Sequence, residues 1–217
     1  MTTQSVPTIG ADRPARTGSA ALVAALGFVL AYFATEALVS AAASSALPLP
    51  DSSSESVRSW FADNPRAAVL MGASQAVSVL SLAWFVRAVG ARSGRPWGLA
   101  AVVLMLVASS CAWVLAAVAP TASLGAVELL RDANFIAGGT AHVVALGTFA
   151  FLTSREGAFG RPVRVLSAVA LGACVLSLSS LLVFEGAAFI LLGRLLCMVW
   201  AISAAVSLIR RGRRAER

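Results

Sequence analysis

Six long runs of apolar residues alternate with short polar breaks along the chain. A helix needs about 20 apolar residues to cross the hydrocarbon core of a bilayer, and every run is long enough. The pattern predicts an all-α fold, a polytopic membrane bundle of six transmembrane helices in one domain, 18–209. A disordered cytoplasmic tail is expected at 1–17 and a basic one at 210–217. The predicted spans are about 18–44, 66–89, 97–119, 134–153, 163–184 and 187–209.

Short breaks between the runs carry residues that start or end helices. Pro65, Pro96 and Pro162 stand where the first turn of a helix tolerates proline. The two residues Glu185-Gly186 leave so short a turn that the last two spans must be antiparallel neighbours. Gly-Arg-Pro occurs twice, at 94–96 and 160–162, and hints at a repeat of spans two and three in spans four and five.

Composition supports a membrane protein and argues against a lysine-bound cofactor and a nucleic-acid partner. Apolar residues make up 59% of the 217 residues and charged residues 12%, against about 45–50% and 25% in soluble domains. All 17 basic residues are arginine, so a lysine Schiff base to retinal or pyridoxal phosphate is excluded. The arginines do not form a patch with interleaved aromatic residues, and we expect no nucleic-acid partner.

The arginines are distributed unevenly between the two sides of the predicted bundle. With the N-terminus in the cytoplasm, thirteen lie on the cytoplasmic side and three outside. By the positive-inside rule, both termini are expected in the cytoplasm, and the arginine-only, alanine-rich composition favours a bacterial inner membrane. A cleavage site at 40–46 is the alternative, but the apolar run before it is longer than that of a signal peptide. The three outer arginines are Arg58, Arg66 and Arg131.

Two outer loops carry apolar residues at helical spacing. We expect short helices at 51–63 and 121–132 that lie along the membrane interface. The side chains expected to face lipid are Val57, Trp60 and Phe61 in the first, and Leu124 and Val127 in the second.

Three ionisable residues lie inside predicted spans, and such residues are costly and often functional. At 1.5 Å rise per residue, Glu36 lies about 7 Å, His142 about 3 Å and Arg194 about 4 Å outward of the middle of its span. Further polar residues share the outer half, which predicts a polar cavity open to the outside. The candidate ligand-binding residues are Glu36, Gln75, Ser109, Ser110, His142, Ser179 and Arg194.

The same three residues allow a structural and a functional interpretation. Glu36 and Arg194 are expected to face each other, with His142 near, because pairing offsets the cost of a charge in hydrocarbon. That pair would tie the first span to the last. The alternative is a substrate-binding or proton-handling role for all three. For His142 alone, a hydrogen bond between helices is the favoured interpretation.

No cofactor or metal is expected. Cys111, Cys174 and Cys197 all lie in apolar runs without CxxC spacing, which is typical of buried small side chains. A single histidine cannot provide bis-histidine haem ligation. No His, Cys and carboxylate residues cluster in the sequence as a metal site would require.

The stretch 57–65, with Trp60-Phe61-Ala62-Asp63-Asn64-Pro65, followed by Leu82-Ala83-Trp84-Phe85, resembles small six-span integral membrane proteins of high-GC bacteria. The layout of span four, Gly-Arg-Pro and a new span is similar to theirs. The resemblance covers about two thirds of the chain and implies a fold. Since no catalytic residues are established for those proteins, it implies no activity.

Gly72-Ala73-Ser74-Gln75 and Ala141-His142 are similar to the serine and histidine motifs of rhomboid intramembrane proteases. In a rhomboid-like site, His142 would remove the proton of Ser74. This sequence departs from the family at Gln75, which stands where rhomboids have glycine. It also lacks the glycine after the histidine, and one span instead of three precedes the serine.

The sequence favours a non-enzymatic function, in which a lipid or small hydrophobic molecule binds in the outward cavity or the bundle acts as an accessory protein. One alternative is an intramembrane enzyme acting on a lipid-like substrate with Glu36, His142 and Arg194. Another is a small transporter, although the spans show no breaks and no clear inverted repeat. Expected partners are membrane lipids, with a homo-oligomer or a membrane-protein partner as further options.

Overall fold

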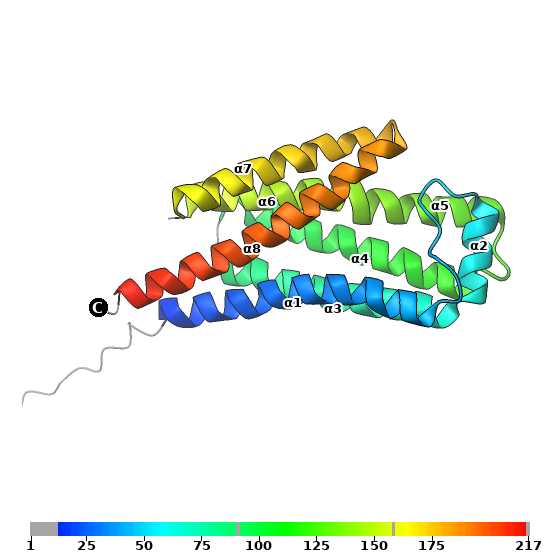
Figure 1. The fold of residues 1–217 in the computed structure, drawn as a ribbon, viewed down its shortest axis with the longest axis horizontal. Helices are drawn as coiled ribbons and strands as arrows, with labels where there is room; N and C mark the ends of the chain where they lie inside the picture. Colours follow the sequence, from blue (N-terminus) through cyan, green and yellow to red (C-terminus); the bar gives the residue numbers. More distant parts are fainter. Residues whose placement is uncertain (1–12, 90–91, 158, 216–217) are drawn as a thin grey trace, which may run out of the picture.

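The computed structural model describes residues 13–89, 92–157 and 159–215, and within them the chain is a bundle of helices without strands (Figure 1). Six helical segments are long and apolar enough to cross a membrane, which confirms the predicted all-α fold with six spans. The elements are α1 (Arg13–Ala42), α2 (Ser54–Asp63), α3 (Pro65–Val89), α4 (Arg95–Val118), α5 (Leu124–Asn134), the π-helix η1 (Phe135–Ala141), α6 (His142–Glu156), α7 (Arg161–Leu176), the 3-10 turns η2 (Ser177–Leu181) and η3 (Phe184–Gly186), and α8 (Ala187–Ala215).

Proline and glycine place the helix boundaries as the sequence predicts. α3 begins at Pro65, and Pro96 and Pro162 lie in the first turns of α4 and α7, where proline lacks an N–H that the helix would leave unused. Each Gly-Arg-Pro triplet therefore opens a span. At the α7–α8 turn, a Cβ on Gly186 would come within 2.4 Å of the backbone nitrogen of Ser180, so this tight turn requires glycine.

The spanning helices form a closed ring. Each packs against the next along the chain, and α8 returns to pack against α1. Small residues allow this closure: Gly18 lies against Ile209, and Ala21 and Ala25 are fully buried. Because lipid tails are as apolar as the helices, close packing through small residues is a main source of helix association in membranes.

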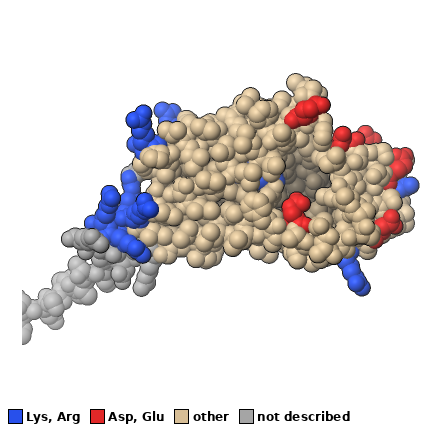
Figure 2. Space-filling view, in the orientation of Figure 1, with Lys and Arg blue, Asp and Glu red and all other residues tan. Residues whose placement is uncertain are grey.

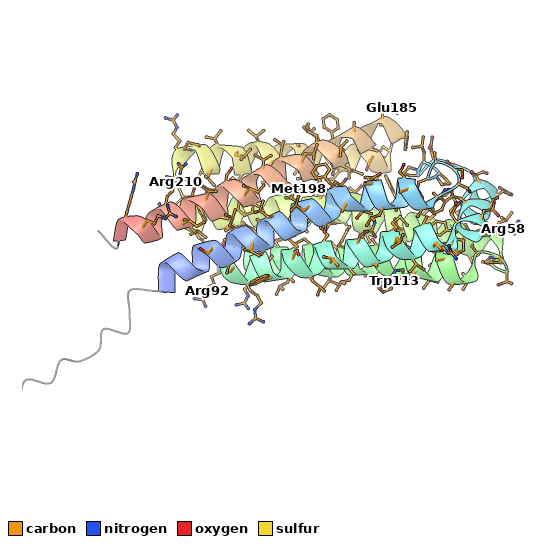
Figure 3. The ribbon with its side chains drawn as sticks, turned by 60° about the horizontal axis from the view of Figure 1, so that its bottom comes forward. Arg58, Arg92, Trp113, Glu185, Met198 and Arg210 are labelled. Carbon is orange, nitrogen blue, oxygen red and sulfur yellow. The ribbon has the colours of Figure 1, made fainter. Side chains whose placement is uncertain are left out.

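The two ends of the bundle carry opposite charges. The described chain ends lie together at one end (Figure 1), where Figure 3 labels Arg92 and Arg210, whereas Arg58 and Glu185 are labelled at the opposite end. Basic side chains gather at the first end and acidic ones near the second (Figure 2). We call these the arginine end (Arg87, Arg92, Arg95, Arg155, Arg161, Arg164 and 210–214) and the acidic end (Glu55, Asp63, Glu128, Asp132 and Glu185).

Four boundaries differ from the prediction. The fifth span is predicted to reach 184, but α7 ends at Leu176 and the 3-10 turns η2 and η3 follow it. α1 begins at Arg13, inside the tail predicted as disordered at 1–17; residues 1–12 lie outside the described part. α8 continues through most of the predicted basic tail to Ala215. The fourth span begins at Leu124 because η1 joins α5 to α6 in one continuous helical segment.

At the acidic end, α2 crosses the ends of the spans, and α5 continues the line of α6 beside it (Figure 1). We call these two helices the cap. Val57, Trp60 and Phe61 of α2 are only 4–6% exposed, and Val127 of α5 is fully buried. The expectation that these four side chains face lipid is therefore wrong. They pack on apolar side chains at the ends of the spans, which would otherwise stay uncovered: Val39, Ala67, Ala68, Met71, Ala112, Leu115 and Ala119.

The segment 43–53 between α1 and α2 is tied to α2. Asn64, at the end of α2, accepts hydrogen bonds from the backbone N–H and the hydroxyl of Ser44, at 2.7 and 2.9 Å. Its own amide donates to the carbonyl of Trp60. The indole of Trp60 in turn donates to the carbonyl of Ser45, at 3.1 Å. These bonds hold the segment against the cap.

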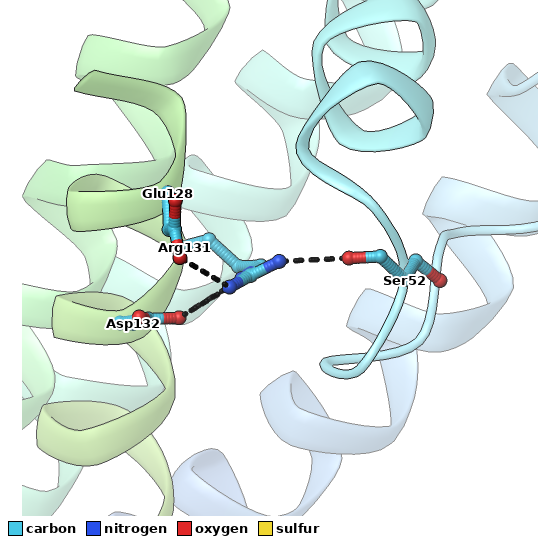
Figure 4. Close-up of polar contacts among 4 residues, drawn as sticks. All are labelled: Ser52, Glu128, Arg131 and Asp132. Atoms are coloured by element: carbon cyan, nitrogen blue, oxygen red, sulfur yellow. Dashed lines mark hydrogen bonds and ion pairs between the residues drawn. The ribbon is translucent and has the colours of Figure 1, made fainter. Parts of the chain in front are cut away.

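Arg131 of α5 holds the other end of the same segment (Figure 4). Its Nη1 donates to the carbonyl of Ser52 at 2.7 Å, while Nε lies 2.9 Å from Asp132 Oδ1. Glu128 lies one turn earlier, 4.0 Å from Nη2. The segment 43–53 is therefore a fixed wall at the acidic end.

The arginine half of the bundle has an aromatic core. Phe85, Phe149 and Trp200, from α3, α6 and α8, meet edge to face with ring centroids 5.5–6.1 Å apart. Each is at most 1% exposed. The indole of Trp200 donates to the hydroxyl of Ser154 at 2.7 Å, which satisfies its polar group.

Candidate functional site

Arg194 lies on α8, inside the bundle and toward the acidic end. Its Nη2 donates to the carbonyl of Gly138 in η1, and its guanidinium carbon lies 5.2 Å from the centroid of the Tyr32 ring. Its Nε is buried and has no hydrogen-bond partner in the described structure. Both contacts are with neutral groups, so the positive charge of Arg194 is not compensated by them.

The π-helix explains why the Gly138 carbonyl is available. The N–H of His142, where the π-helix ends and α6 begins, donates to the carbonyls of Ala137 and Gly139, on either side of Gly138. This change of register passes over one carbonyl, that of Gly138. Short π segments are frequent at functional sites, and here the segment gives the arginine its acceptor.

Arg194 lines a cavity of about 280 Å³. It lies where α1 and α8 diverge toward the acidic end (Figure 1), and Figure 2 shows the molecule hollowed there on its side face. The opening therefore faces the region that lipid occupies around a membrane bundle, and not the water beyond the capped end. Its polar lining is Tyr32, Gln75, Asn134 and Arg194, and its apolar lining includes Met105, Phe135, Ile190 and Leu191.

A second cavity of about 360 Å³ adjoins the first. Pro50, Asn134 and Phe135 line both. The second cavity is mostly apolar, and residues of the segment 43–53 form one wall. Two charged side chains, Glu36 and Arg131, also line it. Its apolar lining includes Leu47, Leu49, Val57, Phe61, Met71 and Leu115.

Glu36 does not pair with Arg194, so the predicted ion pair is wrong. Glu36 is exposed on α1 and lines the second cavity, whereas Arg194 lines the first. Among the described residues, every ion pair involves Arg131. Arg194 is held instead by the Gly138 carbonyl and the Tyr32 ring. Depth along the helices does not indicate either contact.

His142 is buried, at 1% exposure, and lines neither cavity. Its Nδ1 forms a 2.8 Å hydrogen bond with the carbonyl of Ala101 on α4, as the favoured interpretation of an interhelical bond expects. Arg194 lies within electrostatic range of it. Glu36, His142 and Arg194 therefore do not line one common cavity, and this geometry argues against the three-residue enzyme site.

The other candidate polar residues separate into two groups. Gln75 lines the first cavity, and the buried hydroxyl of Ser109 lies 3.4 Å from its Oε1. Ser110 is exposed and Ser179 is half-buried, and each hydroxyl donates to a carbonyl of its own helix turn. The structure thus brings Gln75 to the site, with Ser109 behind it, and leaves Ser110 and Ser179 outside.

Ser74 and His142 do not form a rhomboid-like dyad. The hydroxyl of Ser74 donates to the carbonyls of Leu70 and Met71 in its own helix, at 2.8 and 3.1 Å. The Nδ1 of His142 is bonded to a carbonyl of α4. Neither side chain has the contact that proton transfer between them would need.

Two site residues were missed by sequence reasoning. Tyr32 is the single tyrosine of the chain, and it lies one helical turn before Glu36, a spacing that could have drawn attention to it. Asn134 is predicted as the first residue of a span, but it lies within the continuous helical segment Leu124–Glu156. Its side-chain amide donates to the carbonyl of Ala108 at 2.7 Å. No sequence signal singled out Gly138, because its role depends on the π register.

The three cysteines are buried and free, and the Sγ atoms of Cys174 and Cys197 lie 3.7 Å apart between α7 and α8. In the part of the chain that the structure describes, no group of three or more His, Cys, Asp or Glu side chains is arranged to hold a metal ion.

Comparison with protein-family models, with curated proteins and with solved structures finds no match to this chain, so the resemblance to small six-span bacterial membrane proteins stays a prediction.

Proposed function

We propose that the protein binds a lipid-like amphiphile in the cavity between α1 and α8, with an anionic group of the ligand on Arg194. The observation that carries the proposal is that Arg194 lies in a membrane-spanning helix and that its contacts, the Gly138 carbonyl and the Tyr32 ring, supply no negative charge. A charge in this environment is costly unless it is paired. A phosphate or carboxylate on the ligand would provide the pair, since planar guanidinium groups bind both through parallel hydrogen bonds.

The shape and lining of the cavities support a lipid-like ligand. The two cavities, of about 280 and 360 Å³, lie near the lower end of the range of about 300–1,000 Å³ that is typical of small-molecule sites. Polar groups surround Arg194, and apolar groups line the adjoining space. The anionic group of the ligand would lie in the first cavity beside Arg194, and the ligand would extend from there along the second cavity. The side opening would allow entry from the bilayer.

Lipid retention tests this function. The protein is purified in a mild detergent, and copurified lipid is extracted and identified by mass spectrometry. Arg194→Gln should retain about tenfold less lipid, because a hydrogen-bonded charge contact is lost. Arg66→Gln is the matched control, since it removes an exposed arginine at the acidic end. Equal retention by both variants, or an empty wild-type protein, would contradict the proposal.

We also propose that the protein lies in the bacterial inner membrane with both termini in the cytoplasm. The gathering of arginines at the end that holds both described chain ends supports this orientation. Reporter fusions after Arg95 and Arg164 should give a cytoplasmic signal, and fusions at Asp51 or Arg131 an external one. An external C-terminus would overturn the orientation. In the proposed orientation, with both termini in the cytoplasm, the cavities lie at the depth of the outer leaflet.

A further inference from the structure

Glu36 is a second charge without a partner beside the same site. It is exposed on a membrane-spanning helix, and no hydrogen bond or ion pair joins it to another described residue. A carboxylate at this depth carries the same cost as the unpaired arginine. A ligand that satisfies Arg194 alone would leave this cost in place.

The two charges are held in a fixed relation by α1. Tyr32 stacks on Arg194, and Glu36 follows Tyr32 by four residues, so it lies on the same helix face and about 6 Å closer to the acidic end. The cavities lined by Arg194 and by Glu36 share Pro50, Asn134 and Phe135. An occupant of both cavities would therefore meet Arg194 and then, about one helical turn outward, Glu36. The other charged side chain of the second cavity, Arg131, is already paired with Asp132 and Glu128.

We propose that the ligand is a zwitterion with a phosphate and a primary ammonium group, the phosphate on Arg194 and the ammonium on Glu36. This inference rests on the proposed function and narrows its ligand class. Such a group compensates both charges and adds no net charge to the site. A purely anionic headgroup would compensate Arg194 but would bring a second negative charge next to Glu36.

The chemistry of Glu36 favours a primary ammonium over a quaternary one. An ammonium with N–H groups donates charge-assisted hydrogen bonds to a carboxylate. A quaternary ammonium has no N–H and is usually bound by a cage of aromatic rings. The aromatic side chains that line the second cavity are Phe61 and Phe135. Among the described residues, its lining includes no tryptophan, the ring that binds cations best.

Native mass spectrometry of the detergent-purified protein with three lipids of identical acyl chains tests the proposal. Phosphatidylethanolamine should bind about tenfold more tightly than phosphatidylglycerol or phosphatidylcholine. Glu36→Gln should abolish this preference, because the primary ammonium then loses the carboxylate that accepts its hydrogen bonds. Arg194→Gln should weaken all three, because all carry the phosphate. Glu185→Gln, which removes an exposed carboxylate at the same end, should preserve the preference.

The outcomes separate this proposal from the proposed function. If phosphatidylglycerol binds as tightly as phosphatidylethanolamine, or if Glu36→Gln keeps the preference, the zwitterion is wrong while lipid binding stands. If wild-type protein binds none of the lipids, both proposals fail. Free phosphoethanolamine in large excess distinguishes the sources of the headgroup chemistry. Displacement of bound lipid identifies a water-soluble zwitterion as sufficient, and no displacement identifies the lipid itself.

Discussion

The two halves of the bundle are built from the same helices but differ in packing. In the arginine half, Phe85, Phe149 and Trp200 fill the centre and are at most 1% exposed. In the acidic half, α1 and α8 diverge and the centre holds two cavities, with Arg194 and Gln75 among the lining residues. The first half is apolar and dense, and the second is polar and open.

This difference separates the part of the bundle that is densely packed from the part that contains the cavities. Helices in a bilayer are held together mainly by close packing, and the aromatic core supplies it in one half. The other half needs external support, which α2, α5 and the segment 43–53 provide through the cap. The cavities can therefore stay open without loss of the fold. Substitutions should affect the two halves differently.

Trp200→Ala should have the largest effect on stability. It removes a fully buried indole, its two aromatic contacts and its bond to Ser154. Truncation of a buried tryptophan typically costs about 3–5 kcal/mol, so the melting temperature in detergent should fall strongly. Trp84→Ala is the control, because Trp84 is 51% exposed on the outside of the bundle. A similar fall for both variants would show that the aromatic core does not stabilise this half.

Asn64→Ala should have an intermediate and local effect. The change removes the bonds of Asn64 to Ser44 and to the carbonyl of Trp60, at a cost of about 1–3 kcal/mol for the buried groups left unpaired. Hydrogen exchange should accelerate in the segment 43–53 and in α2, and the arginine half should keep its protection. Ser59→Ala, which removes an exposed hydroxyl of α2, should change neither. Faster exchange throughout the bundle would contradict a separate cap.

The smallest effect is expected for the coupling between Glu36 and Arg194 in protein stripped of lipid. Because the two side chains line different cavities, the effects of Glu36→Gln and Arg194→Gln on melting should add within about 0.5 kcal/mol. A stable ion pair would give a larger coupling, with partial recovery in the double variant. Such recovery would show that the charges meet directly and that the open half closes without a ligand.

The sequence was sufficient for the six spans and for those boundaries that proline places. Runs of apolar residues report the thickness of the membrane directly, and Pro65, Pro96 and Pro162 start helices for local steric reasons. The short break between the last two spans predicted that α7 packs on α8, as it does, but not the 3-10 turns that separate them. These features depend on residues close together in the chain.

The site was harder to predict because depth along a helix does not determine direction around the bundle. Glu36 and Arg194 have similar depths, yet they line different cavities. The partner of Arg194 is a backbone carbonyl that becomes available only in a π segment, which no residue type announces. Likewise, the apolar face of α2 could cover lipid or protein, and its pattern is the same in both cases.

The π segment also sets the rotational phase of one long span. Passing over one carbonyl amounts to inserting one residue into an α-helix, a turn of roughly 100° about the helix axis. The face that α5 presents to α2 and the face that α6 presents to α7 are thereby set independently along a single continuous helix. A one-residue deletion within Phe135–Ala141 would restore a regular α-helix and rotate α5 by roughly 100° relative to α6. Either the contacts of α5 with α2 or those of α6 with α7 would then be lost.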